Sequence, residues 1–436
     1  MDGEHSCTDA RLEAEPRARG PDGPAGASVA TPSGAGGVLT AQPLVPARDS
    51  WSVSAGPLPA ALASFFLVAL SMMSIWLPWE GGTAPVDVVL IGATAVAALL
   101  LLATGPVNLE LEHALVRITI AVWAYVTLAT IWTVFFAGDP MRLLMDAYSF
   151  FFLLTPLVLL RAHPEGPHRV VYWAIAAAGL FGAVTIFLDP LQRPDGALAN
   201  PNMAATWLGG AAVLLAATRL PGNRVVKLLV VAIMLVACLR TQSYSAVLAV
   251  LAALVYWAAL SNRRPLVRLS AYAAFGVGLI AWQWILASLP GEDRLERSRG
   301  SRELIWATAF EAWQDHPFGI GYGNFMAHVY VPFEQGHYVP EGMPTHNDFL
   351  TALVEMGPIG VIALVGLLAV IWFSGRRATR TVLVFFVVSA LFHNVLNWRH
   401  LWIFVAIALA FDLAQTHGRG AAQTESAEAA EKGAHP

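Results

Sequence analysis

The chain has 436 residues, of which 56% are hydrophobic and only 13% are charged. A soluble globular protein carries about 25% charged residues, so this composition excludes an ordinary soluble domain. The formal net charge of −4 indicates no particular partner, because in a membrane protein the placement of Lys and Arg matters more than their total.

The apolar residues are gathered in runs of about 17–22 residues, the length that a helix needs to cross a hydrocarbon core about 30 Å thick. A transmembrane β-barrel would instead show alternating segments of about ten residues. We therefore predict an all-α polytopic membrane protein with about twelve transmembrane helices. The expected spans are 58–78, 86–104, 115–136, 143–160, 170–188, 202–218, 225–241, 243–260, 268–288, 352–373, 380–397 and 400–415.

The polar segments divide the chain. Residues 1–57 are rich in Gly, Pro, Ala and Ser and lack the apolar surface needed to fold. We expect a disordered tail there, or an extension upstream of the true start, and no cleavable signal peptide. The rest is expected to comprise nine spans within 58–288, a loop at 289–351 (the long loop), three spans within 352–415 and a disordered tail at 416–436.

Basic residues alternate between successive connections, which gives an orientation. One set of connections holds Arg161 and Arg169; Arg219, Arg224 and Lys227; Arg263, Arg264 and Arg268; and Arg376, Arg377 and Arg380. The other set is nearly devoid of Lys. The positive-inside rule then predicts that both termini are cytoplasmic and that the long loop lies outside. The two cysteines, Cys7 and Cys238, are far apart and predict neither a disulfide framework nor a metal site.

The long loop contains a candidate helix that begins at Ser301. Its apolar residues repeat at helical spacing: Ile305, Trp306, Ala309, Phe310 and Trp313. Ser301 is the expected N-cap, and Arg302 and Trp306 would share one face. This helix is expected to lie on the membrane surface with its aromatic face down and Arg302 near the headgroups. The alternative is a solvated helix in which Arg302 pairs with a carboxylate.

A glycine-rich run follows at 317–323. Gly319, Gly321 and Gly323 permit positive φ angles and close approach of the backbone. The run neither follows a strand nor opens a helix with Lys-Ser/Thr, so it is not a phosphate loop. We expect a tight turn that seats the long loop.

His346 ends the long loop just before the next apolar helix. Thr345 or Asn347 is expected to cap that helix, which would place His346 at or near its first turn. An imidazole has an unperturbed pKa of about 6.5, and a helix N-terminus keeps it neutral. We predict that His346 is a general base, with Asn347 and Glu355 as orienting residues. The alternative is a histidine that only hydrogen-bonds the loop.

Single arginines recur in the short outward connections. They are Arg142, Arg193, Arg240 and Arg399. Such residues could together clamp a diphosphate, because the guanidinium fork suits phosphate oxygens. The alternative is that each extends to the lipid headgroups. Arg240 is favoured for the clamp, and the amides of Asn200 and Asn202 are candidates for binding sugar hydroxyls.

Taken together, three segments resemble the O-antigen ligase and O-antigen polymerase superfamily of bacterial membrane glycosyltransferases. They are Asn200-Pro201-Asn202-Met203-Ala204-Ala205; residues 301–306 leading through 317–325; and His346-Asn347-Asp348-Phe349-Leu350 with residues 355–360. The resemblance covers roughly residues 58–415 in topology and motif order. One departure is that the family often has a Ser-Arg pair at the start of the eighth span, where this chain reads Thr241-Gln242-Ser243 and Arg240 lies just before.

The resemblance implies a GT-C-like enzyme of the bacterial inner membrane with its active site in the periplasm. The implied reaction is inverting, metal-independent and cofactor-free transfer of a glycan from undecaprenyl diphosphate. His346 would be the base, and Arg302, Arg240 and Arg142 would bind the diphosphate. Supporting residues for the acceptor or sugar would be Asn347, Glu355, Asn200, Asn202, His337 and Arg399.

Within the family, the loop lengths favour a ligase that joins the glycan to lipid A–core. Polymerases commonly have two long periplasmic loops, whereas the loop around Asp189–Asn202 is short. A lipid-linked glycan polymerase and a protein O-oligosaccharyltransferase are the alternatives. A polysaccharide or lipid transporter is an alternative of another class, but no internal repeat is visible and few ionisable residues lie in the spans, Asp146 and Asp412 among them.

Overall fold

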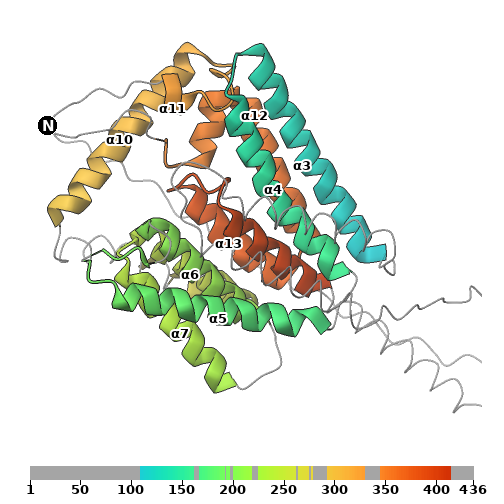
Figure 1. The fold of residues 1–436 in the computed structure, drawn as a ribbon, viewed down its shortest axis with the longest axis vertical. Helices are drawn as coiled ribbons and strands as arrows, with labels where there is room; N and C mark the ends of the chain where they lie inside the picture. The colour runs from blue at the N-terminus through green and yellow to red at the C-terminus, as the bar shows by residue number, and fades with distance from the viewer. Residues whose placement is uncertain are drawn as a thin grey trace, which may run out of the picture. The chain divides into compact units, whose positions relative to one another are not determined.

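The structure is entirely helical over the residues that it describes. This computed structural model describes residues 109–161, 166–191, 193–196, 200–218, 224–261, 264–273, 276–277, 292–328 and 344–413. The helices are α3 (Leu109–Phe135), α4 (Pro140–Arg161), α5 (Gly166–Leu188), α6 (Pro201–Ala217), α7 (Arg224–Arg240), α8 (Tyr244–Ser261), α10 (Glu292–Asp315), α11 (Phe325–His328), α12 (Asp348–Ser374) and α13 (Arg377–Ala390), with a further helix at 399–413 (Figure 1). The predicted all-α class is confirmed for these residues.

Four helices are long and apolar enough to cross a membrane: His113–Phe135, Pro140–Val158, Val171–Leu188 and Asp348–Ser374. Pro201–Ala217 and Tyr244–Leu260 are apolar but shorter. These lengths support a membrane protein. The two tails, the expected spans at 58–78 and 86–104 and most of 268–288 lie outside the described residues. The arrangement of twelve spans therefore stays a prediction.

The expected span at 380–397 is wrong at its C-terminal end. α13 ends at Ala390, and residues 391–398 are not helical. The side chain of Asp348 provides hydrogen-bond acceptors for backbone N–H groups of this non-helical segment. Its Oδ2 accepts hydrogen bonds from the N–H groups of Val395 (2.8 Å) and Leu396 (3.1 Å). A buried backbone N–H needs a partner, and a side chain of another helix supplies it here.

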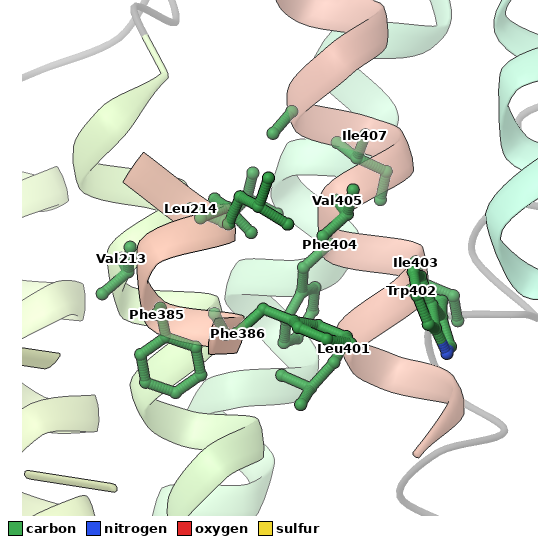
Figure 2. Close-up of a cluster of buried hydrophobic side chains, with 14 of the residues drawn as sticks. Val213, Leu214, Phe385, Phe386, Leu401, Trp402, Ile403, Phe404, Val405 and Ile407 are labelled. Carbon is green, nitrogen blue, oxygen red and sulfur yellow. The ribbon is translucent and has the colours of Figure 1, made fainter. Parts of the chain in front are cut away.

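The helix at 399–413 forms the centre of the core. It is apolar on all sides, and such a helix is buried all round. Trp402 is fully buried, and its ring lies 4.7 Å from Phe386 of α13 and 5.1 Å from Phe150 of α4. Figure 2 shows this cluster, with Phe404 between the two helices and Leu214 of α6 nearby. Packing among α4, α6, α13 and 399–413 thus fixes the frame that carries the polar residues.

α12 is kinked where Gly357 precedes Pro358. Gly357 has φ 68° and ψ −166°, outside the helical region. Pro358 has no N–H group and cannot bond the carbonyl of Val354 four residues earlier. That carbonyl instead accepts from Ile320 N–H at 3.0 Å, and the carbonyl of Glu355 accepts from Gly321 N–H at 3.1 Å. The kink therefore exposes two carbonyls that bind the glycine-rich run.

Residues 317–323 form the expected tight turn, called the glycine turn below. Gly319, Gly321 and Gly323 all have positive φ. A Cβ on Gly319 would lie 2.4 Å from the carbonyl oxygen of Glu355, so only glycine allows this approach. The turn also contacts α3, since Trp132 donates from Nε1 to the carbonyl of Phe318 at 2.7 Å. It thus joins the long loop to two helices.

α10 differs from the helix that we expected at 301–313. It begins at Glu292, so Ser301 lies inside it and is not its N-cap. Its buried residues Ile305 and Ala309 pack against Val354 of α12 and Phe325 of α11. α11 and α12 therefore cover part of the predicted apolar face, whereas Phe310 is exposed, and its docking on the membrane stays a prediction.

Candidate functional site

His346 lies between the long loop and α12 in an uncommon backbone conformation. Its φ is 55°, in the left-handed region that few non-glycine residues adopt. Its N–H donates to the side-chain oxygen of Asn394 at 2.8 Å. Asn347, the next residue and one of the two predicted caps, is the N-cap of α12 and accepts from the N–H groups of Phe349 and Leu350. His346 therefore lies directly before the N-cap of α12, near its first turn.

The imidazole of His346 is half-buried and neutral. Burial lowers its pKa to about 4, and the nearby charge of Arg302 contributes in the same direction. We had expected the N-terminus of the following helix to keep the ring neutral. Desolvation and a neighbouring cation do so instead. A neutral imidazole that is still accessible can accept a proton.

A hydrogen bond from Trp306, one helical turn after Arg302, orients this part of α10 toward His346. Trp306 of α10 donates from Nε1 to the carbonyl of Thr345 at 2.8 Å. Residues four apart share one face of a helix, so this bond turns the face that carries Arg302 toward His346. Among the described residues, no acceptor bonds the partly buried guanidinium of Arg302. Its charge acts on the imidazole of His346.

A second histidine stands beside the first. The rings of His346 and His393 are perpendicular, with centroids 6.4 Å apart. His393 is buried, and its Nε2 shares a 2.5 Å hydrogen bond with Ser245 at the start of α8. Its face stacks on Trp398 at 5.4 Å. Sequence reasoning missed His393, because the prediction of a continuous span to 397 hid it in an apolar helix.

Arg193 lies at the turn between α7 and α8. Its guanidinium donates to the carbonyl of Thr241 at 3.3 Å and to Oδ1 of Asn202 at 2.5 Å. The charge of Arg193 is near enough to act on His393. Arg193 thus contacts Thr241 at the start of the segment 241–243, and Asn202 orients it.

Arg240 has a different environment. It donates to the carbonyls of Ile186 (3.2 Å) and Asp189 (2.9 Å) at the C-terminus of α5. Helix C-termini carry unpaired carbonyls and a partial negative charge, which an arginine stabilises. Arg240 therefore has a structural partner, and its expected role with diphosphate stays a prediction.

Arg142 forms an ion pair with Asp146 one turn later on α4, at 3.1 Å. Tyr322 of the glycine turn donates to the same carboxylate oxygen at 2.5 Å. Both Asp146 and Tyr322 are buried. The guanidinium expected to bind diphosphate is thus part of a polar cluster that fastens the glycine turn to α4.

Two of the remaining predicted site residues, Asn200 and Arg399, make structural contacts. Asn200 caps α6, accepting from the N–H groups of Asn202 and Met203. The guanidinium of Arg399 lies 5.4 Å from the ring centre of Tyr148. His337 lies outside the described residues.

The expected orienting residues of His346 have other partners. Glu355 is buried and accepts from Phe325 N–H at 3.3 Å. Asn347 caps α12 with its side chain, as described above. The orienting contact on His346 instead comes from Asn394, which the sequence did not single out. In the part of the chain that the structure describes, no group of three or more His, Cys, Asp or Glu residues is placed to hold a metal ion.

The candidate site thus contains a neutral histidine and a partly buried arginine, both from the long loop. A family model described as O-antigen ligase matches residues 229–365. The match covers roughly a third of the chain and supports the resemblance to O-antigen ligases and polymerases. No curated protein matches the chain.

The matched range contains Arg302 and His346 but not the whole candidate site. Arg193, His393 and Asn394 lie outside residues 229–365. They enter the site through contacts between residues about 48 or more positions apart, such as His346 with Asn394. A sequence motif contains residues that are close together along the chain, so it does not identify such distant partners.

Proposed function

We propose that this protein is an O-antigen ligase. It transfers a glycan from undecaprenyl diphosphate to a hydroxyl group of lipid A–core at the periplasmic face of the inner membrane. The observation that supports this proposal is the arrangement of His346 and Arg302: a neutral, half-buried imidazole beside a guanidinium that no described residue bonds. A base and a phosphate-binding cation are what transfer from a lipid diphosphate needs.

The residues divide the reaction between them. His346 takes the proton from the acceptor hydroxyl as that oxygen attacks the anomeric carbon. The bond from the anomeric carbon to the diphosphate oxygen breaks, and the lipid diphosphate leaves with the electron pair. Negative charge develops on the leaving oxygen, where the fixed charge of Arg302 stabilises it. In-line attack inverts the anomeric centre, and the diphosphate itself activates the sugar, so neither a nucleotide nor a metal ion is required.

Donor binding would also activate the base. The charge of Arg302 contributes to the low pKa of His346. A diphosphate bound at Arg302 offsets that charge and raises the pKa of His346 toward its ordinary value. The imidazole then becomes a stronger base only when a donor is present, which limits reaction with water.

Arg193 is the second arginine in this proposal. It lies beside the His393 side of the site, and Asn202 fixes its direction. Arg240 stays a candidate from the resemblance, but its guanidinium bonds the end of α5. The electrostatic effect of Arg193 on His393 favours Arg193 as the arginine that assists Arg302.

A ligase is favoured over a polymerase because the loop after α5 is compact. Asp189 accepts from the N–H groups of Leu191, Asp195 and Gly196, which folds the described part of this loop back on itself. A transporter is disfavoured because both acidic residues expected in the spans have structural partners. Asp146 pairs with Arg142, and Asp412 accepts from the backbone of α13.

A His346→Ala strain tests the function by lipopolysaccharide gel. A ligase defect removes the ladder on lipid A–core, while long polymer accumulates on undecaprenyl diphosphate. Polymer reduced to single repeat units would indicate a polymerase, and an unchanged ladder would reject the role of His346. His316→Ala is the matched control, because His316 is an exposed histidine of the long loop. Reconstitution with purified donor and acceptor, with and without chelator, separates an enzyme from a transporter and tests the need for a metal ion.

A further inference from the structure

The conformation of His346 requires a restraint from outside its own segment. A φ of 55° is uncommon for a histidine and persists only where neighbouring groups hold it. Asn394, in the connection after α13, supplies one such group by accepting from His346 N–H at 2.8 Å. Neither Asn347 nor Glu355 bonds the histidine.

The side chain of Asn394 is itself fixed. Its Nδ2 donates to the hydroxyl of Thr351 at 2.8 Å and to that of Thr345 at 3.5 Å. These hydroxyls also bond each other at 2.5 Å. An amide flip would turn an N–H toward the N–H of His346, leaving two donors facing each other. The oxygen of Asn394 is therefore held toward His346.

His393 restrains the imidazole ring of His346 from the other side. Ser245 holds its Nε2, and Trp398 covers its face. His393 is 2% exposed, so it cannot turn away toward solvent. Its ring meets that of His346 at right angles. Asn394 thus fixes the backbone of His346, and the adjacent residue His393 lies beside its ring. Both residues belong to the connection after α13.

We propose that Asn394 and His393 are positioning residues for the base His346, a role that rests on the proposed function. Asn394 holds the backbone in the left-handed conformation, and His393 limits the rotation of the ring. The reason is geometric: a displacement of about 1 Å at a reacting group can cost about a hundredfold in rate. Neither residue touches the substrate in this scheme, so their effect falls on kcat.

The experiment uses the full-length protein reconstituted with lipid-linked donor and lipid A–core acceptor. Asn394→Ala is expected to lower kcat about 10- to 100-fold, with the KM for the donor changed less than about twofold. Asn394→Asp keeps an acceptor for His346 N–H, and the threonine hydroxyls can donate to its carboxylate. The kcat of Asn394→Asp is expected to be at least about tenfold higher than that of Asn394→Ala.

A pair of phenylalanine variants separates positioning from packing. His393→Phe keeps the stack on Trp398 but loses the bond to Ser245. His400→Phe is the matched control, because His400 is equally buried and stacks on Trp398 at 5.8 Å. Only His393→Phe should lower kcat, by about tenfold, and alter the rate at which diethyl pyrocarbonate modifies His346.

Two outcomes would overturn the inference in different ways. An inactive His346→Ala beside an unaffected Asn394→Ala rejects the positioning role alone, as does an equal loss in the two phenylalanine variants. A fully active His346→Ala rejects the base and the positioning role together. If Asn394→Ala fails to fold, the comparison of Asn394→Asp with the wild type and of His393→Phe with His400→Phe still decides the matter.

Discussion

His346 and Arg302 are coupled electrostatically: burial, and then the charge of Arg302, lower the pKa of His346 to about 4. An imidazole acts as a base only in its neutral form. The free enzyme therefore keeps its base at pH values where an ordinary histidine, with a pKa of about 6.5, would be half protonated. Under the proposed function, a donor diphosphate bound at Arg302 would work against this shift.

The first prediction concerns the dependence of the rate on pH. For His346, kcat/KM should stay level from pH 7.5 to 5.5 and fall only as the pH approaches 4, because kcat/KM reports the free enzyme. The acid limb of kcat should lie at a higher pH, because the bound diphosphate raises the pKa of the base. Measured profiles with both limbs near pH 6.5 would contradict the coupling.

The same coupling can be measured without turnover. Arg302→Gln should raise the pKa of His346, because it removes a neighbouring positive charge. The pKa is obtained from the pH dependence of diethyl pyrocarbonate modification at His346, read by mass spectrometry. Burial remains in the variant, so the pKa should rise without reaching that of an exposed imidazole. An unchanged value would mean that Arg302 is too distant to act on the base.

The second prediction compares Arg193 and Arg240, which have different hydrogen-bond partners. Arg193→Gln should raise the KM for the lipid-linked donor about tenfold, which corresponds to the loss of one charge-assisted hydrogen bond of about 1.5 kcal/mol. Arg240→Gln should mainly lower the melting temperature, because Arg240 bonds the C-terminus of α5. A larger KM effect in Arg240→Gln would return the role to that residue.

The glycine turn gives a third prediction, about stability. Gly319→Ala should destabilise the fold by roughly 1–3 kcal/mol, because φ is 95° and the new Cβ would lie 2.4 Å from the carbonyl oxygen of Glu355. The matched control is Gly366→Ala in α12, where a Cβ meets no atom within 4 Å. Alanine there should stabilise the helix by up to about 1 kcal/mol. Thermal unfolding in detergent compares the two, and equal shifts would argue against the packing of the turn on α12.

The cap of α12 gives a fourth prediction. Asn347→Ala should cost about 1 kcal/mol locally, because two N–H groups of the first turn lose their acceptor. Hydrogen exchange at Phe349 and Leu350 should become faster. Asn347→Asp retains an acceptor and should keep exchange slow. Unchanged exchange in the alanine variant would show that another group caps the helix.

Several parts of the site could be predicted because they depend on local sequence. Helical spacing in the long loop identified the face that carries Arg302 and Trp306, and Asn347 is a favoured N-cap residue before an apolar run. Gly319, Gly321 and Gly323 predicted the tight turn, because glycine permits a positive φ. In the structure each of the three has a positive φ. These inferences involve residues within one or two turns of each other.

Other parts could not be predicted, because they depend on which segments meet. The sequence predicted an unbroken span at 352–373, and only the fold shows the kink at Gly357 and brings Ile320 to the carbonyl of Val354. The sequence favoured Arg240 among four outward arginines, but the fold places Arg193 on Thr241 and Arg240 on the end of α5. Partners tens of residues apart are selected by packing, not by local preference.

The sequence by itself determined the helical class, the membrane-protein composition, the family motifs and the pairing of Arg302 with His346 as candidates. Composition and local spacing are sufficient for these, because helices form within short stretches of chain. Only the tertiary structure decided that α10 docks on α12, that Arg193 lies near the paired histidines and that Asn394 holds His346. Long-range hydrogen bonds and buried packing fix these contacts, and neither is written in any single segment.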